Sequence, residues 1–176
     1  MIRSIILMIL VTLLTGCLEK APVNIPVAGY NFTDHSVISI WIDKKWVGSV
    51  SHAQGGASTC CVSLPYNYKP GTKLTLDWDR YDCSVSNNEC IEKYKGKDWP
   101  IKRIHREVEI PPYNMNSVAE LQLAFLPGDE VRAYADNRSF SHSEHPSHKE
   151  FGNLLEDTVP LEGKWPKARN KTGVEK

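Results

Sequence analysis

Two cysteines stand side by side in the stretch QGGASTCCVSLP, which runs from Gln54 to Pro65. Adjacent cysteines are compatible with a metal site, a redox switch, a catalytic thiol with a neighbour, or disulfide bonds to other parts of the chain. Disulfides persist in oxidising compartments and are rare in the cytosol. The compartment therefore decides which chemistry applies.

The N-terminus, MIRSIILMILVTLLTGCLEK, has the organisation of a secretion signal. Arg3 precedes an almost wholly apolar run, residues 4–14, which is shorter than the roughly 20 residues of a membrane span. A run of this length suits the hydrophobic region of a signal peptide. Its end, Leu14 to Cys17, resembles the bacterial lipobox, in which cleavage before the cysteine leaves the thiol to carry diacylglycerol.

We therefore expect residues 1–16 to be a lipoprotein signal peptide and Cys17 to be the lipid attachment site. Leu18 follows, rather than the aspartate associated with inner-membrane retention in enteric-type bacteria. The expected location is the outer membrane, lipid-anchored and facing the periplasm.

Four cysteines remain as disulfide candidates: Cys60, Cys61, Cys83 and Cys90. They allow three connectivities, which the sequence alone does not resolve. Adjacent residues joined by a trans peptide lie about 3.8 Å apart at Cα, below the usual disulfide range of roughly 4.4–6.8 Å. This favours pairing each of Cys60 and Cys61 with Cys83 or Cys90, although a loop closed by Cys83 and Cys90 is the alternative.

Metal and catalytic sites have weaker support. The adjacent cysteines lack the spacing of a zinc site. His142, His145 and His148 recur every three residues, but Pro146 interrupts them and no apolar residues support a helix, so we expect a solvated loop. The chain has no G-x-S-x-G, H-E-x-x-H or phosphate-binding glycine motif. We expect no enzyme activity, no metal and no cofactor.

Strand signals dominate the mature chain. The run 72–78 alternates strictly, with Leu74, Leu76 and Trp78 on one face. The runs 37–42 and 46–50 are separated by a turn signal, and residues 120–126 and 130–135 flank Pro127-Gly128-Asp129 as in a hairpin. Together they predict an all-β fold, an antiparallel β-sandwich of immunoglobulin-like type.

The expected organisation is a single domain of 160 residues after signal cleavage. Residues 17–26 form a lipid-anchored tether, 27–136 the β-sandwich, and 137–176 an irregular polar segment whose end is disordered. Lysine plus arginine and aspartate plus glutamate each total 21, so charge gives no indication of nucleic-acid binding. Trp41 and Trp78 are expected in the core, whereas Trp99 is expected to pack locally or to be an exposed contact residue.

Several blocks occur in an order that resembles a known family. They are AGYNFTDHSV (28–37), the GG…CCVSLP block, KPG…LTLDW, VEIPPY (108–113) and LAFLPGDEVR (123–132). Together they resemble the bacterial lipoprotein family of domain of unknown function 3304, over roughly residues 27–148. Members are often associated with phospholipase effectors of the type VI secretion system and are regarded as immunity proteins.

The resemblance implies that this chain binds and inhibits a secreted phospholipase and so protects the producer and its kin. We expect the partner-binding residues in the loops around Gln54, Gly55, Gly56 and Ser58, in the 83–90 loop, and at Trp99. The alternative is a cell-envelope binding or scaffold lipoprotein with no toxin partner.

Overall fold

The computed structural model describes residues 20–151, apart from residues 53, 85–86 and 141. The expected signal peptide, Cys17 and the residues after 151 lie outside this part of the chain. The helices and strands, in chain order, are β1 (Val23–Asn31), β2 (Val37–Ile42), β3 (Lys45–Val50), β4 (Gly55–Leu64), β5 (Lys73–Tyr81), α2 (Asn88–Lys93), β6 (Ile101–Glu109), the 3-10 turn η1 (Met115–Ser117), β7 (Glu120–Leu126), β8 (Glu130–Asp136) and α3 (His148–Phe151).

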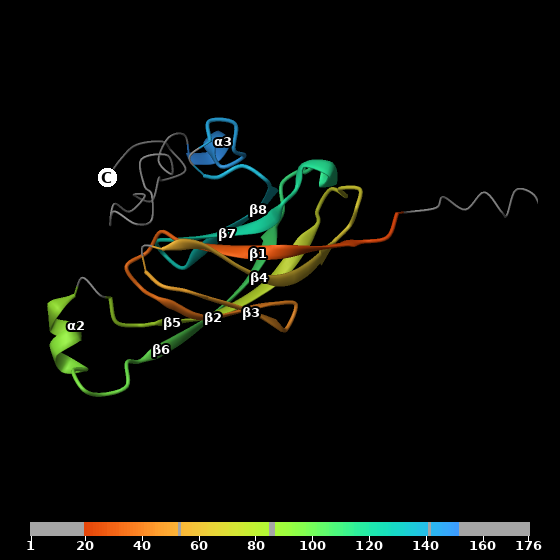
Figure 1. Ribbon diagram of the computed structural model, residues 1–176. Coiled ribbons are helices and arrows are strands. Elements are labelled where there is room, and N and C mark those ends of the chain that lie inside the picture. Colours follow the sequence, from red (N-terminus) through yellow and green to blue (C-terminus); the bar gives the residue numbers. More distant parts are fainter. Residues whose placement is uncertain (1–19, 53, 85–86, 141, 152–176) are drawn as a thin grey trace, which may run out of the picture.

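The strands form two four-stranded sheets that pack face to face (Figure 1). One sheet has the order β4-β1-β7-β8 and the other β3-β2-β5-β6. Neighbouring strands are antiparallel except β1 and β7, which run parallel. The prediction of an all-β sandwich is confirmed. None of the helices in the described residues is long and apolar enough to cross a membrane.

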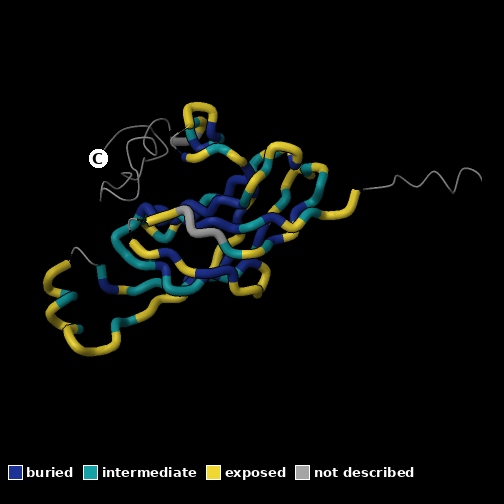
Figure 2. Tube along the Cα trace, in the orientation of Figure 1, coloured by how far each residue is buried: buried dark blue, intermediate teal, exposed yellow. Residues whose placement is uncertain are grey.

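The core lies between the two sheets, where the buried residues concentrate (Figure 2). The alternation read from the sequence is present in β5, in which Leu74, Leu76 and Trp78 are all buried. The Trp78 ring meets Phe125 of the opposite sheet edge to face, with centroids 5.5 Å apart. Burying side chains of this size stabilises the fold by about 1.5–3 kcal/mol each, so this face of β5 is a principal source of stability.

Both predicted hairpins are present, and each has the turn chemistry that its length requires. In the β2–β3 turn, Asp43 and Lys44 have φ values of 48° and 68°. Positive φ at both central residues is what a two-residue hairpin turn of this kind needs. In the β7–β8 turn, Gly128 and Asp129 also have positive φ.

Three features of the fold differ from expectation: the start of β1, the presence of α2 and the position of Trp41. β1 begins at Val23, so the last four residues of the expected tether belong to the sheet. Helix α2 was not predicted, because it has only six residues and none of them is buried, so it leaves no apolar stripe in the sequence. Trp41 was expected in the core but is only half-buried, because it faces outward from β2 beneath the guanidinium of Arg103, 4.8 Å from the ring centroid.

The segment after β8, here called the C-terminal strap (Asn137–Phe151), packs on the outer face of the sheet that contains β1. Phe140 is buried there and meets the rings of Tyr30 and Tyr134 at centroid distances of 4.8 and 5.9 Å. These side chains belong to a second, smaller hydrophobic cluster. The described part of the strap consists of turns and the short helix α3, and these aromatic contacts hold it against the domain.

Candidate binding surface at the loop end

Four connections meet where β1 finishes, at the left of Figure 1. They are the β1–β2 loop (Phe32–Ser36), residues 51–54 between β3 and β4, the β5–β6 connection (Asp82–Pro100) and the β7–β8 turn (Pro127–Asp129). Backbone hydrogen bonds join them to the ends of the strands: Asn31 N donates to Gln54 O at 2.8 Å, and Tyr81 N to Ser36 O at 3.2 Å. We call this surface the loop end.

Asn31 joins two of these connections from inside. Its side chain is fully buried, and its Nδ2 donates to the carbonyl oxygens of His35, at 2.7 Å, and Ser51, at 3.2 Å. Its Oδ1 accepts from the backbone N and the Oγ1 of Thr33, at 3.0 and 2.8 Å. A buried amide with all these partners satisfied holds both loops in one conformation. The sequence shows only an asparagine at a strand end, so this role was missed.

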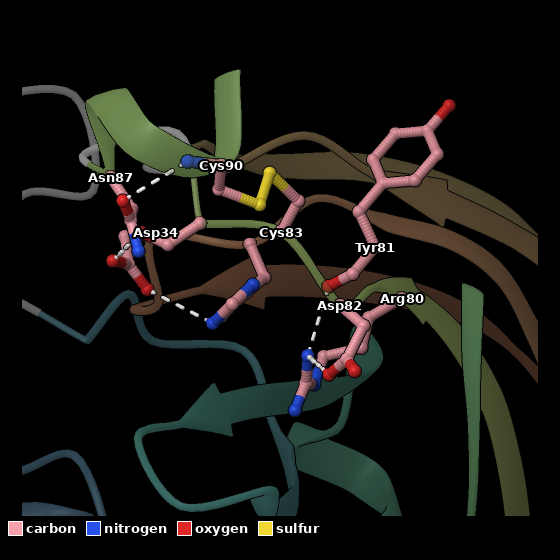
Figure 3. Close-up of a disulfide and its surroundings, with 9 residues drawn as sticks. Asp34, Arg80, Tyr81, Asp82, Cys83, Asn87 and Cys90 are labelled. Atoms are coloured by element: carbon pink, nitrogen blue, oxygen red, sulfur yellow. Dashed lines mark hydrogen bonds and ion pairs between the residues drawn. A yellow bond between two sulfur atoms is a disulfide. The ribbon is translucent and has the colours of Figure 1, made fainter. Parts of the chain in front are cut away.

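A disulfide stabilises the β5–β6 connection. Cys83 bonds Cys90 of α2, and Asn87 caps the helix by accepting from Cys90 N at 3.2 Å (Figure 3). Ser84 Oγ donates to Asp34, which links the same connection to the β1–β2 loop. The predicted cross-pairing to Cys60 and Cys61 is therefore wrong, and the alternative, a small loop closed within one connection, is the one observed.

Cys60 and Cys61 bond to each other within β4, and the peptide between them is cis. Across the ladder Thr59 pairs with Val27 and Val62 with Ile25, so the two cysteines face the single residue Pro26. One extra residue on one strand is a β-bulge, and a proline, which has no N–H, suits the partner position. Both cysteines of this disulfide lie within β4, so the bond does not connect the strand to a loop.

An ionic network joins the β7–β8 turn to the other sheet. Asp129 accepts from Arg80 through both carboxylate oxygens, at 2.5 and 3.2 Å, and from Lys102 at 2.8 Å. The Arg80 and Asp129 side chains are only 12% and 16% exposed. Burial acts to raise the pKa of Asp129, but the hydrogen bonds and charges of Arg80 and Lys102 outweigh it and lower the pKa to about 2. The turn is thus held in place by a carboxylate that stays ionised.

Beside this network lies a cavity of about 300 Å³. Its walls are apolar and its rim is polar and charged. The lining residues include Phe32, Val37, Trp78, Phe125 and Leu126 on the walls and Asp34, His35, Arg80, Asp129 and Glu130 on the rim. Apolar pockets of this size with a few polar groups at the mouth are suited to hold one apolar group of a ligand or partner.

The predicted partner-binding residues are brought together in part. Gln54 lies at the loop end, and Trp99 lies there too, half-buried, with its ring 5.5 Å from that of Tyr81. Gly55, Gly56 and Ser58, however, are part of β4 and not of a loop. Ser58 pairs with Ala28 in the middle of the sheet.

The histidine-rich segment is not the solvated loop that was expected. His145 is 1% exposed, with Nε2 2.8 Å from Gln122 Oε1 and Nδ1 2.7 Å from Ser147 Oγ. Burial lowers its pKa to about 4. Nowhere in the described residues do three or more His, Cys, Asp or Glu side chains gather as a metal site would need. The prediction failed because Phe140, a lone aromatic in a polar run, anchors the strap.

Comparison with known proteins identifies the family. Neither a curated protein nor a solved structure matches the chain. A family model described as "Protein of unknown function (DUF3304)" matches residues 30–133, a span from the end of β1 to the middle of β8 that includes all four connections of the loop end. Because this match covers more than half of the sequence, the chain belongs to that family.

Proposed function

We propose that the protein is a lipoprotein of the outer membrane that faces the periplasm, where it binds and inhibits a type VI secretion phospholipase. It is an immunity protein that protects the producer and its kin, and it acts by binding alone. The observation that carries this proposal is the loop end, where four connections lie together and two of them, the β1–β2 loop and the β7–β8 turn, line an apolar cavity.

The internal bonds of the loop end support a binding role. Binding costs about 0.5–1.5 kcal/mol for each flexible side chain that it immobilises, in addition to the ordering of loops. Here Asn31, the Cys83–Cys90 disulfide and the Arg80–Asp129 pair already hold the loops in place. A surface that is already ordered loses less conformational entropy on binding, so it binds more tightly for a given buried area.

The proposed inhibition is steric. An apolar side chain of the phospholipase enters the cavity, and the surrounding loops cover the mouth of its active site or the face with which it meets the membrane. The disulfide-closed connection extends furthest from the sandwich in Figure 1 and widens the covered area. The lipid on Cys17 concentrates the inhibitor at the membrane that the toxin attacks.

The test is a pull-down of the domain from Leu18 onward against the phospholipase encoded beside it, with lipase activity measured in the same samples. Tight binding with loss of activity is the expected result. Absence of binding by folded, oxidised domain would contradict the proposal and leave a scaffold lipoprotein of the envelope as the better account.

A matched pair of tryptophan variants locates the interface. Trp99→Ala removes an aromatic ring at the loop end, and we expect it to weaken inhibition about tenfold, as loss of a contact residue of this kind does. Trp46→Ala removes a ring that is 57% exposed on β3, and we expect inhibition to be unchanged. Equal effects of the two variants would contradict placement of the interface at the loop end.

A further inference from the structure

The opposite end of the sandwich carries a group of lysines, here called the lysine end: Lys20, Lys44, Lys45, Lys69 and Lys73. All five are exposed. Lys69 lies in the β4–β5 connection, Lys73 begins β5, and Lys44 lies in the β2–β3 turn, which is bonded to β5 by Asp43 N donating to Thr75 O at 2.9 Å. Lys20 Nζ lies 4.0 Å from the ring centroid of Tyr66, where β4 has just ended. The start of β1, the β4–β5 connection and the β2–β3 turn all lie to the right in Figure 1.

The β2–β3 turn with Lys45 and the β4–β5 connection with Lys73 together carry four lysines and one acidic residue, Asp43, so these two connections are net positive. Glu107 and Glu109 lie beside them at the end of β6, and Glu107 is paired with Lys73 at 3.4 Å. Asp136, where β8 ends, lies at the same end of the sandwich and is paired with Arg138 at 2.7 Å. Lys44 stands at a position of positive φ, where glycine or asparagine would fit the turn with less strain. The tip of the turn therefore carries a cationic side chain at a position where its backbone conformation is strained.

Three tyrosines with half-buried side chains lie among these lysines. The rings of Tyr68 and Tyr113 meet edge to face with centroids 5.4 Å apart, and Tyr113 Oη donates to Pro65 O at 2.8 Å. Tyr66 Oη donates to Asn116 Oδ1 at 2.7 Å. Tyrosine together with lysine is the composition found at the boundary between membrane and water.

The length of the chain brings this end to the membrane. Three residue steps separate Cys17 from Lys20, and a fully extended chain spans at most about 3.6 Å per residue. Lys20 can therefore lie no more than roughly 11 Å from a lipid-modified Cys17. The ammonium group of Lys20 packs over the ring of Tyr66, which lies among the other lysines. A short distance from Cys17 to Lys20 therefore also keeps the rest of the lysine end near the lipid headgroups.

We infer that the lysine end is a second membrane contact, which binds anionic lipid headgroups and holds the loop end pointing into the periplasm. The orientation rests on the proposed lipid anchor at Cys17, whereas headgroup binding is a property of the lysine end itself. A basic surface that contacts anionic headgroups adds to the membrane binding of a lipid anchor and restricts how the domain is oriented on the membrane.

The test compares two triple variants of the domain from Leu18 onward, which keeps every described buried hydrophobic residue, Ile25 to Phe140. One variant, K44E/K45E/K69E, reverses charge at the lysine end. The control, K93E/K95E/K97E, makes the same change on and just after α2 at the loop end. The probe is co-sedimentation with phosphatidylglycerol vesicles or phosphatidylcholine vesicles at low ionic strength.

Wild type and the α2 control should bind phosphatidylglycerol vesicles and release them in high salt, with little binding to phosphatidylcholine. Each lysine near an anionic surface contributes about fivefold, so loss of three lysines alone should weaken binding about 100-fold. The charge reversal in the lysine-end variant should weaken it by at least that factor. Equal binding by the two triple variants, or no binding by wild type, would overturn the inference.

Lipase inhibition by the same proteins separates this inference from the proposed function. The lysine-end variant should inhibit the phospholipase in solution as well as wild type does. Loss of inhibition together with unchanged vesicle binding would overturn the inference, because the lysine end would then be a protein-binding surface. If wild type as well as both variants fails to inhibit, but vesicle binding follows the expected pattern, the proposed function fails and the membrane contact stands.

Discussion

Replacing Asp129 by asparagine tests whether its carboxylate holds the loop end together. The substitution keeps the size of the side chain but removes the charge that pairs with Arg80 and Lys102. The pKa of Asp129 is lowered from 3.8 to about 2. Each unit of pKa corresponds to about 1.4 kcal/mol, so the ionised carboxylate contributes about 2 kcal/mol to stability at pH 7.

Urea unfolding of wild type and Asp129→Asn at pH 7 measures this contribution. With a denaturant slope of about 2 kcal/mol/M, the midpoint should fall by about 1 M. A carboxylate with a depressed pKa stabilises the fold fully above its unfolded pKa, and this contribution is lost as the pH falls toward its folded pKa. The difference between the two proteins should therefore shrink to about half at pH 3 and nearly vanish at pH 2.

Asp82→Asn is the matched control. Asp82 also contacts Arg80, at 3.1 Å, but its side chain is 54% exposed, and exposed ion pairs contribute less than about 1 kcal/mol. Midpoints for Asp129→Asn that coincide with those of Asp82→Asn at pH 7 would refute the assignment of the network to Asp129.

Three further changes probe the disulfide and the strap. Cys83→Ser with Cys90→Ser opens a loop with a sequence separation of 7, which should cost about 2.5 kcal/mol in the thermal unfolding of oxidised protein; an unchanged melting temperature would contradict this. Burial lowers the pKa of His145 to about 4, so the imidazole should titrate near pH 4 by NMR, and stability should fall between about pH 6.5 and pH 4; titration near 6.5 would mean that the strap is open in solution. Phe140→Ala should cost about 3 kcal/mol in urea unfolding and raise the pKa of His145 toward its ordinary value, whereas an unchanged pKa would show that other contacts hold the strap.

The strands could be predicted because the signal for a half-buried strand is local. Leu74, Leu76 and Trp78 alternate with polar residues, and that period is enough to give both the strand and its buried face. Trp41 shows the limit of the same logic. Its run reads as buried, but which residues of β2 face inward depends on the register with β5, which is a long-range property.

The candidate binding surface was predicted only in part, because spatial proximity depends on topology. Gln54 and Trp99 are far apart in sequence, and they share one end of the fold only because β1, β3, β5 and β7 all finish there. The buried Asn31 and His145 resemble ordinary polar residues in the sequence, since their role depends on partners 20 and 23 residues away. The disulfides were mispaired because four cysteines allow three connectivities, and their spacing in the sequence does not choose among them.

The position of β1 has a mechanical consequence. β1 is the first strand after the proposed lipid anchor, yet it lies in the interior of its sheet, paired with β4 on one side and β7 on the other. Its start is the end of the strand nearer in sequence to the proposed anchor, and its end reaches the loop end (Figure 1). Under the proposed function, tension between the membrane and a bound partner would therefore run along the strand. Inter-strand hydrogen bonds lie across that direction, and those of seven residue pairs to β4 and five to β7 would share the load in shear rather than open one at a time. Under the proposed function, this arrangement would keep the domain folded when a partner bound at the loop end is pulled away from the membrane.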